Sequence, residues 1–227
     1  MKIHNVEQRS VEWCALRAAV PTASEFNAVV SPLWKVRDSD GVKTYVAQKL
    51  AEWWLGGPLV TFNVFDMEQG KVLEEEAVPW WEATHGKTIE RVGFITNDSG
   101  LVGCSPDGLI GDCGLEIKCP RVDTHVAWLL AGGVPKDHLA QVHGGMYVTG
   151  FKRWRFLSYC RRLPAIDIVV ERDPKAQEAI GSALGQFYER FEAGKKLMID
   201  ANGGPPKRFV QSPVPQPVAE EKIDILP

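Results

Sequence analysis

The stretch that decides the fold is Ser105-Pro106-Asp107-Gly108-Leu109, followed after a short gap by Leu115-Glu116-Ile117-Lys118-Cys119-Pro120. Between the two stands Gly111-Asp112-Cys113-Gly114. Glycine and aspartate in such a short segment are typical of a tight turn between two antiparallel strands. The pattern therefore predicts a β-hairpin that brings the ends of the two stretches together.

The predicted hairpin gathers polar side chains on one face. Residues two apart in a strand point to the same face, so Glu116 and Lys118 share one face while Ile117 and Cys119 point into apolar packing. Pairing across the turn places Asp107 beside Glu116. Two carboxylates are hard ligands for Mg²⁺, and a lysine beside them can orient an attacking water and offset developing charge. The pattern favours a metal-dependent phosphodiesterase; an ordinary hairpin with exposed polar side chains is the alternative.

Composition indicates an ordinary globular protein. The chain has 227 residues, a length that suits one domain or one domain with appendages. Of these residues 44% are hydrophobic, and the net charge is −3. The sequence shows no apolar membrane span and no signal peptide, which predicts a cytoplasmic protein without membrane partners. The five cysteines include no C-x-x-C pair, so neither a disulfide framework nor a zinc site is predicted. The acidic balance argues against a protein that coats DNA by charge alone.

The periodicity predicts an α+β fold, with a mixed central β-sheet flanked by helices. Helices are expected over 11–18, 22–30, 41–54, 63–84, 122–131, 137–147 and from 173 onward, and strands near 89–94, 101–104, 154–159 and 166–171. Beyond Asn202 the prolines exclude both a helix and a central strand. We therefore expect a domain over residues 1–202 and a Pro-rich tail or arm over 203–227.

Further candidate residues lie outside the hairpin. Glu74 belongs to a run of acids on a predicted helix, which forms either a solvated face or a third carboxylate of a two-metal site. Gln141 lies on another predicted helix, where a core or surface role is the alternative. Arg17, with Thr22 and Ser24 at the start of the following helix, forms either an anion site or an ordinary helix cap.

Taken together, these residues resemble the lambda-type (YqaJ-like) recombination exonucleases, a branch of the PD-(D/E)-x-K nuclease superfamily. The resemblance extends from about Trp13 to about Ala193. The pieces that carry it, in the order of the family, are Trp13-x-x-Leu16-Arg17, Thr22-Ala23-Ser24, Gly70-Lys71-x-x-Glu74, Cys104 to Leu109, Gly114 to Pro120, Ala140-Gln141-Val142 and Met146 to Thr149. Each piece alone is weak, but the ordered set is specific. It implies a restriction-endonuclease-like core.

The resemblance also implies roles for individual residues. Mg²⁺, for which Mn²⁺ can substitute, would be held by Asp107, Glu116 and the Ile117 carbonyl, with Glu74 near a second ion. The implied catalytic set is Asp107, Glu116, Lys118, Glu74 and Gln141. The implied pocket for a terminal 5′-phosphate, which also binds DNA, consists of Arg17, Ser24 and Ser105, with Thr22 nearby. The chain departs from the family pattern near Lys35, where an arginine is familiar, and at His143, where a glutamine is familiar.

The function implied is that of a Mg²⁺-dependent 5′-to-3′ double-stranded DNA exonuclease that releases 5′-mononucleotides and leaves 3′ single-stranded overhangs for recombination by strand annealing. The family implies a homotrimer ring around DNA ends, a single-strand-annealing recombination protein as partner, and a phage or prophage gene expressed in a bacterial host. Closure of a ring would hold an acidic chain on DNA. Two alternatives remain: a structure-specific or restriction-type endonuclease of the same superfamily, and a non-catalytic DNA-end-binding module.

Overall fold

The structure is a computed structural model that describes residues 1–59 and 64–204. The tail expected over 203–227 lies, from residue 205 onward, outside the described residues. In chain order the elements are β1 (Lys2–His4), α1 (Val11–Arg17), the 3₁₀ helix η1 (Ala23–Ala28), α2 (Asp40–Leu55), α3 (Val64–His85), β2 (Phe94–Thr96), β3 (Gly103–Cys104), β4 (Gly108–Ile110), β5 (Cys113–Lys118), α4 (Val122–Ala131), α5 (Lys136–Thr149), β6 (Arg153–Ser158), β7 (Ile166–Glu171) and α6 (Pro174–Asn202).

The strands form two small sheets rather than one. The first has the order β1-β2-β3 and is antiparallel. The second has the order β4-β5-β6-β7, and within it only β5 and β6 run parallel. The predicted α+β class with a mixed sheet is therefore confirmed, while the single central sheet divides into a mixed and an antiparallel part.

The hairpin predicted from the motif is present as β4 and β5. Gly108 pairs with Leu115 and Ile110 with Cys113, which leaves a turn of two residues that begins at Gly111. Gly111 has a φ of 61°, a left-handed conformation that glycine adopts without a Cβ penalty. The turn therefore fixes the register that sets Asp107 opposite Glu116.

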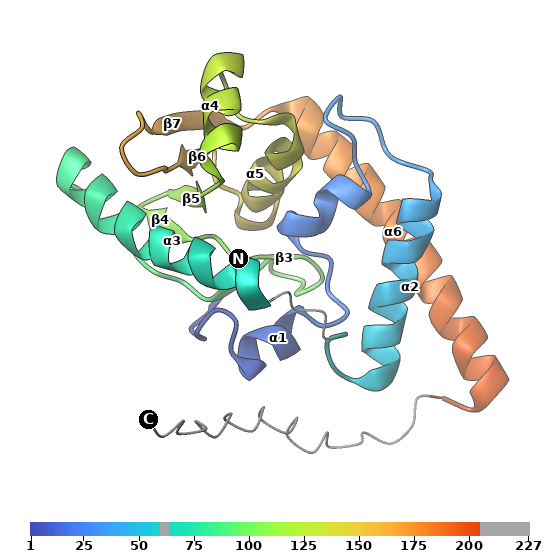
Figure 1. Cartoon of the computed structure of the whole chain (residues 1–227). Helices are drawn as coiled ribbons and strands as arrows, with labels where there is room; N and C mark the ends of the chain where they lie inside the picture. The colour runs from blue at the N-terminus through green and yellow to red at the C-terminus, as the bar shows by residue number, and fades with distance from the viewer. Residues whose placement is uncertain (60–63, 205–227) are drawn as a thin grey trace, which may run out of the picture.

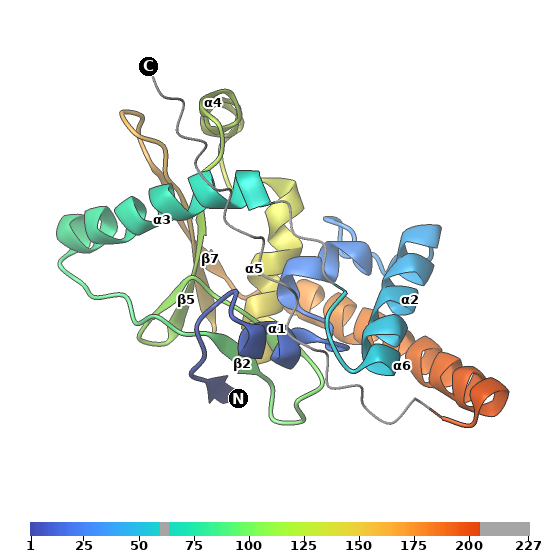
Figure 2. The ribbon, with the colours of Figure 1, turned by 60° about the horizontal axis from the view of Figure 1, so that its bottom comes forward.

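Helices cover both faces of the four-stranded sheet (Figures 1 and 2). On one face, Ala77 and Trp81 of α3 pack with Leu115, Ile117 and Leu157 of the strands. On the other face lies α5, which packs on β6, η1 and α6. Strand β5 is therefore buried on both sides, and Glu116 points into the protein rather than into water.

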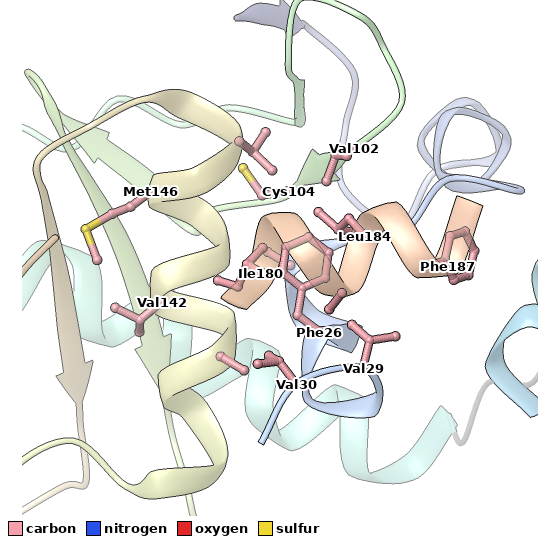
Figure 3. Packing of buried hydrophobic residues seen from close by; sticks show 14 of the residues in the cluster. Phe26, Val29, Val30, Val102, Cys104, Val142, Met146, Ile180, Leu184 and Phe187 are labelled. Carbon is pink, nitrogen blue, oxygen red and sulfur yellow. The ribbon is translucent and has the colours of Figure 1, made fainter. Parts of the chain in front are cut away.

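The larger core joins η1, α5 and α6. Figure 3 shows Phe26, Val29 and Val30 beside Ile180 of α6, with Met146 on the side of α5 that faces the sheet. Each such side chain contributes about 1.5–3 kcal/mol when removed from water. Helix α2 packs across α6 (Figures 1 and 2) and extends this core.

Two predicted elements differ from the structure. The helix expected over 22–30 is the 3₁₀ helix η1, and the strand expected over 89–94 begins only at Phe94. Before that point, Glu90 exchanges two backbone hydrogen bonds with Leu109 of β4, at 2.9 and 2.8 Å. The chain thus leaves one sheet and enters the other within a few residues, which breaks the expected strand. Within the described ranges, none of the helices combines the length and apolarity that crossing a membrane requires.

The indole of Trp154, which belongs to β6, lies between strand β5 and helix α5. A glycine on each of these two elements leaves room for the ring. The indole is 1% exposed. A Cβ at Gly114 of β5 would lie 2.3 Å from the ring, and a Cβ at Gly145 of α5 would lie 2.4 Å from it. Because these distances are far below van der Waals contact, neither position accepts a side chain without displacement of the ring or the helix.

We expect Gly145→Ala to lower the free energy of unfolding by about 1–3 kcal/mol, because the added methyl group overpacks the core. The control is Gly185→Ala on α6, which is exposed and has no atom within 4 Å of the added Cβ. This variant should be neutral or stabilising by up to about 1 kcal/mol, since alanine has the higher helix propensity. Urea denaturation measures both, and equal stabilities would contradict the packing argument.

Candidate active site

Asp107 directly precedes β4 and is held across the hairpin by two hydrogen bonds. Its backbone N–H donates to the Leu115 carbonyl at 3.0 Å. Its carboxylate Oδ2 accepts the backbone N–H of Ile117 at 2.5 Å. The hairpin thus orients both the main chain and the side chain of Asp107 toward β5.

Glu116 lies in the middle of β5 and is 3% exposed. Its Oε1 accepts a hydrogen bond from Lys118 Nζ at 2.5 Å and a second from Gln141 Nε2 of α5 at 2.6 Å. The structure thus places Glu116 and Lys118 on one face of the strand and brings Gln141 to them from a helix. His143, two residues further along α5, is buried against Trp34 instead, with ring centroids 4.8 Å apart.

Glu74 reaches the same site from α3. Its Oε1 accepts from Arg91 Nη1 at 3.0 Å, and the same nitrogen donates to the Asp107 carbonyl at 2.9 Å. Arg9 lies 3.9 Å from the other oxygen of Glu74. Glu76, two residues after Glu74 on α3, faces away from the site and pairs with Arg161. Sequence reasoning missed both Arg9 and Arg91, because nothing in their local sequence marks them as neighbours of Glu74.

A cavity of about 530 Å³ opens beside these carboxylates. Its lining consists of the N-terminal segment 5–9, Glu74 and Glu75 of α3, the segment 91–93, and Asp107. The cavity gives a ligand or solvent access to Asp107 and Glu74 from one side.

The carboxylates are crowded, and this shifts their protonation. Burial, followed by the charges of Glu116 and Glu74, raises the pKa of Asp107 well above its ordinary value. Burial also raises the pKa of Glu116, although Lys118 opposes this. Burial lowers the pKa of Lys118, but Glu116 and Asp107 outweigh it, and the net shift is upward. The site therefore holds more negative charge than its lysine can balance.

This donor set fits a divalent cation. Asp107 and Glu116 offer hard carboxylate oxygens, and their mutual repulsion would be relieved by a bound ion. The Ile117 carbonyl, also predicted as a ligand, lies on the same strand between Glu116 and Lys118. Among residues 1–59 and 64–204, no three His, Cys, Asp or Glu side chains are already gathered closely enough to hold a metal. Both hydrogen bonds that Glu116 accepts go to Oε1, so Oε2 is the oxygen that would hold an ion.

A second polar cluster forms around Arg17 at the end of α1. Its Nη1 donates to Ser105 Oγ at 3.1 Å, and its Nη2 donates to Thr22 Oγ1 and Ser24 Oγ at 3.1 and 3.2 Å. The four residues predicted as an anion pocket thus meet at one point. We call Arg17, Thr22, Ser24 and Ser105 the anion cluster.

Trp13 supports the anion cluster, and sequence reasoning had not given it a role. Its indole N–H lies 2.9 Å from Ser105 Oγ and 3.2 Å from the Gly93 carbonyl. The Arg17 guanidinium lies 4.3 Å from the centre of the Trp13 ring, a cation–π contact. One feature of the sequence could have indicated this contact: Trp13 and Arg17 are four residues apart, which places them on one face of a helix.

The anion cluster and the carboxylates belong to one site. A small pocket is lined by Ser24 and Ser105 from the cluster and by Glu116 and Gln141 from the carboxylate group. An anion at Arg17 would therefore lie next to an ion held by Asp107 and Glu116.

A comparison with known protein families found one match. A model of the family described as "YqaJ-like viral recombinase domain" matches residues 12–152, which is more than half of the chain. A comparison with curated protein sequences gave no match.

Three solved structures share the fold. LHK-Exo in complex with dAMP is 26% identical, with a TM-score of 0.76 over 86% of this chain and 98% of that chain. LHK-Exo is an alkaline exonuclease from Laribacter hongkongensis, and a second structure of it gives 26% identity and a TM-score of 0.70 over 85% and 100% of the two chains. A phage related exonuclease from Haemophilus somnus 129PT is 14% identical, with a TM-score of 0.59 over 77% and 95%, and shows the fold alone.

We expect Mg²⁺ to raise the melting temperature of the chain and Asp107→Asn to abolish this rise. A ligand at a hundred times its Kd stabilises the folded state by about 2.7 kcal/mol. Asparagine keeps an oxygen for the Ile117 N–H but removes the charge. The control is Asp112→Asn in the turn of the same hairpin, whose exposed carboxylate pairs with Arg153. An equal Mg²⁺ effect in the wild type and in Asp107→Asn would contradict the assignment.

Proposed function

Because the chain belongs to the family of YqaJ-like viral recombinase domains, we propose that it is a Mg²⁺-dependent 5′-to-3′ double-stranded DNA exonuclease that releases 5′-mononucleotides and leaves 3′ single-stranded overhangs. Family membership confirms the resemblance predicted from the sequence. The observation that carries the proposal is the small pocket shared by the anion cluster and Glu116. A terminal phosphate bound at Arg17 would place a neighbouring phosphodiester of the same strand at the carboxylates, which is what an enzyme acting on chain ends requires.

Each residue of the site then has a chemical task. Asp107 and Glu116, with the Ile117 carbonyl, would hold the ion, and Glu74 would extend the set toward a second one. The bound Mg²⁺, or Mn²⁺ in its place, would polarise the phosphoryl oxygen and lower the pKa of a bound water. Lys118 orients the attacking water and offsets the charge that develops on the phosphate. Gln141 donates to Glu116 and fixes the direction of its carboxylate.

The assembly and setting follow from the same family. We propose a homotrimer ring that encircles duplex DNA and a single-strand-annealing recombination protein that takes up the exposed strand. The gene would belong to a phage or prophage and the protein would act in the cytoplasm of a bacterial host. Residues 1–202 would form the nuclease domain, which ends with α6, and residues 203–227 an appended arm. A ring accounts for retention on DNA by a chain of net charge −3.

The direct test incubates 5′-phosphorylated duplexes with Mg²⁺ and sizes the products. We expect mononucleotides from linear duplexes, loss of label from the 5′ strand first, and no cleavage of a closed circle. Nicks in the circle would favour an endonuclease of the same superfamily. Stable binding of ends without any Mg²⁺-dependent release would favour the non-catalytic end-binding module.

Lys118→Met should lower turnover by about 10²–10⁴-fold, the range for loss of a group that assists proton transfer. Binding of linear ends, measured by fluorescence anisotropy with Ca²⁺ in place of Mg²⁺, should persist because the carboxylates are unchanged. Lys87→Met, on an exposed lysine beyond α3, is the control. A Lys118→Met protein that hydrolyses DNA at the wild-type rate would remove Lys118 from the catalytic set.

Arg17→Ala should reduce the preference for 5′-phosphorylated over 5′-hydroxyl ends. A hydrogen bond to a charged group contributes about 1.5–3 kcal/mol, so kcat/KM for phosphorylated ends should fall about 10- to 100-fold while hydroxyl ends change little. The control is Arg190→Ala, because Arg190 lies on α6 and its guanidinium pairs with Asp38. If the variant keeps the full preference, Arg17 does not bind the terminal phosphate.

A further inference from the structure

Behind the anion cluster lies a buried lysine that the proposed function does not use. Lys49 on α2 is 4% exposed, although lysine is almost never fully buried unless it is paired. Its Nζ lies 3.2 Å from Glu25 Oε2 and 3.1 Å from Glu52 Oε2. One ammonium thus serves two carboxylates, and both carboxylates contact the segment that carries the anion cluster.

Glu25 connects Lys49 to the anion cluster. Its Oε2 also accepts the hydroxyl of Thr22 at 2.9 Å and the hydroxyl of Tyr45 at 3.1 Å. Burial, and then the charge of Glu25, raises the pKa of Tyr45 well above its ordinary value. Tyr45 is therefore a neutral donor, and Lys49 is the positive charge in direct contact with Glu25.

Glu52 holds the other end of the same segment. Its Oε2 accepts the backbone N–H of Ala19 at 2.8 Å. Ala19 has a φ of 61°, a left-handed conformation that costs about 1–3 kcal/mol in a residue other than glycine. The segment from Arg17 to Glu25 is thus held in an uncommon conformation by two carboxylates that share Lys49.

The direction of the hydrogen bonds assigns different tasks to the hydroxyls. Thr22 has one proton and gives it to Glu25, so its oxygen acts as an acceptor for Arg17 Nη2. In the 3.2 Å contact between Thr22 and Ser24, Ser24 is therefore the donor. Ser105 accepts from both Trp13 and Arg17 and keeps its own proton. Ser105 can turn its proton toward an anion, and Ser24 can do so if it releases Thr22, whereas Thr22 orients Arg17.

Lys49 offsets negative charge that would otherwise weaken the binding of an anion at the anion cluster. A carboxylate behind an anion site repels the anion. The charge of Glu25 reaches Arg17: burial lowers the pKa of Arg17, and among the charges that raise it again Glu25 has the largest effect. Arg17, Glu25, Lys49 and Glu52 also line a common pocket of about 170 Å³. Without the ammonium of Lys49, two partly exposed carboxylates would lie next to the site where a phosphate is to bind.

We propose that Lys49 is a positioning residue that gives the anion cluster its selectivity for a terminal phosphate monoester, by cancelling the charge of Glu25 and holding the segment that carries Arg17. This inference rests on the proposed function, because it assumes that the anion cluster receives the 5′-phosphate of a DNA end. The ligand class is a phosphate dianion on a duplex terminus.

The test measures the ratio of kcat/KM for 5′-phosphorylated and 5′-hydroxyl duplexes in Lys49→Met, Glu25→Gln and the double variant. Lys49→Met should lower the ratio about tenfold or more, because one buried positive charge near the phosphate is lost. Glu25→Gln should raise it, since glutamine still accepts from Thr22 but no longer repels the phosphate. The double variant should return to within about threefold of the wild type. The changes should appear in KM for phosphorylated ends rather than in kcat.

The opposite signs of the two single variants separate a selective role from a structural one. A purely structural role would lower the ratio, or leave it unchanged, in both single variants, without recovery in the double variant, and would overturn the inference. Lys43→Met on the same helix, where Lys43 is exposed and pairs with Asp40, should keep the wild-type ratio. If Lys49→Met does not fold, Glu25→Gln decides alone: a higher ratio supports the inference and an unchanged or lower ratio overturns it.

The same data distinguish failure of the inference from failure of the proposed function. A wild type without any preference for phosphorylated ends would remove the phosphate pocket, and the inference with it. A wild type with that preference, fully retained in Lys49→Met, would overturn the role of Lys49 alone and leave the exonuclease proposal intact.

Discussion

The carboxylates of Asp107, Glu116 and Glu74 repel one another at the centre of the site. Burial strengthens that repulsion, since little water is present to screen it. Each carboxylate has its own partner: the Ile117 N–H for Asp107, Lys118 and Gln141 for Glu116, and Arg91 for Glu74. These partners come from the hairpin, from α5 and from the segment that precedes β2. The arrangement of the elements therefore also supplies the hydrogen bonds and charges that allow three carboxylates to lie close together.

Packing at a distance from the carboxylates sets their geometry. Gln141 reaches Glu116 at 2.6 Å only because α5 lies close to β5. That approach is set by Trp154, which fills the space between Gly114 and Gly145. A larger residue at either glycine would push the helix away from the strand and lengthen the bond to Glu116. The two glycines thus link the hydrophobic core to the chemistry of the site, although neither carries a functional group.

Local patterns in the sequence predicted the features that depend on neighbouring residues. Alternation in the strand predicted that Glu116 and Lys118 share a face, and the helices expected over 11–18 and from 173 onward are present as α1 and α6. Features that depend on distant contacts were missed. Strand β1 has only three residues and pairs with β2, whose residues lie 90 to 94 positions further along the chain. Arg9, Arg91 and Lys49 look like ordinary surface cations in the sequence, and only the tertiary structure brings them to carboxylates.

The two adjoining halves of the site attract ligands of opposite charge. At the carboxylates, Glu74 pairs with Arg91 and Arg9, while Asp107 and Glu116 share the single cation Lys118, so negative charge is in excess around Asp107 and Glu116. At the anion cluster, the Lys49 ammonium offsets the carboxylates behind Arg17, so that Arg17 remains available to an anion. A cation at the first and a phosphate at the second would each reduce the charge that the other meets across the shared pocket. Their binding should therefore be mutually favourable, a reciprocity that linkage requires.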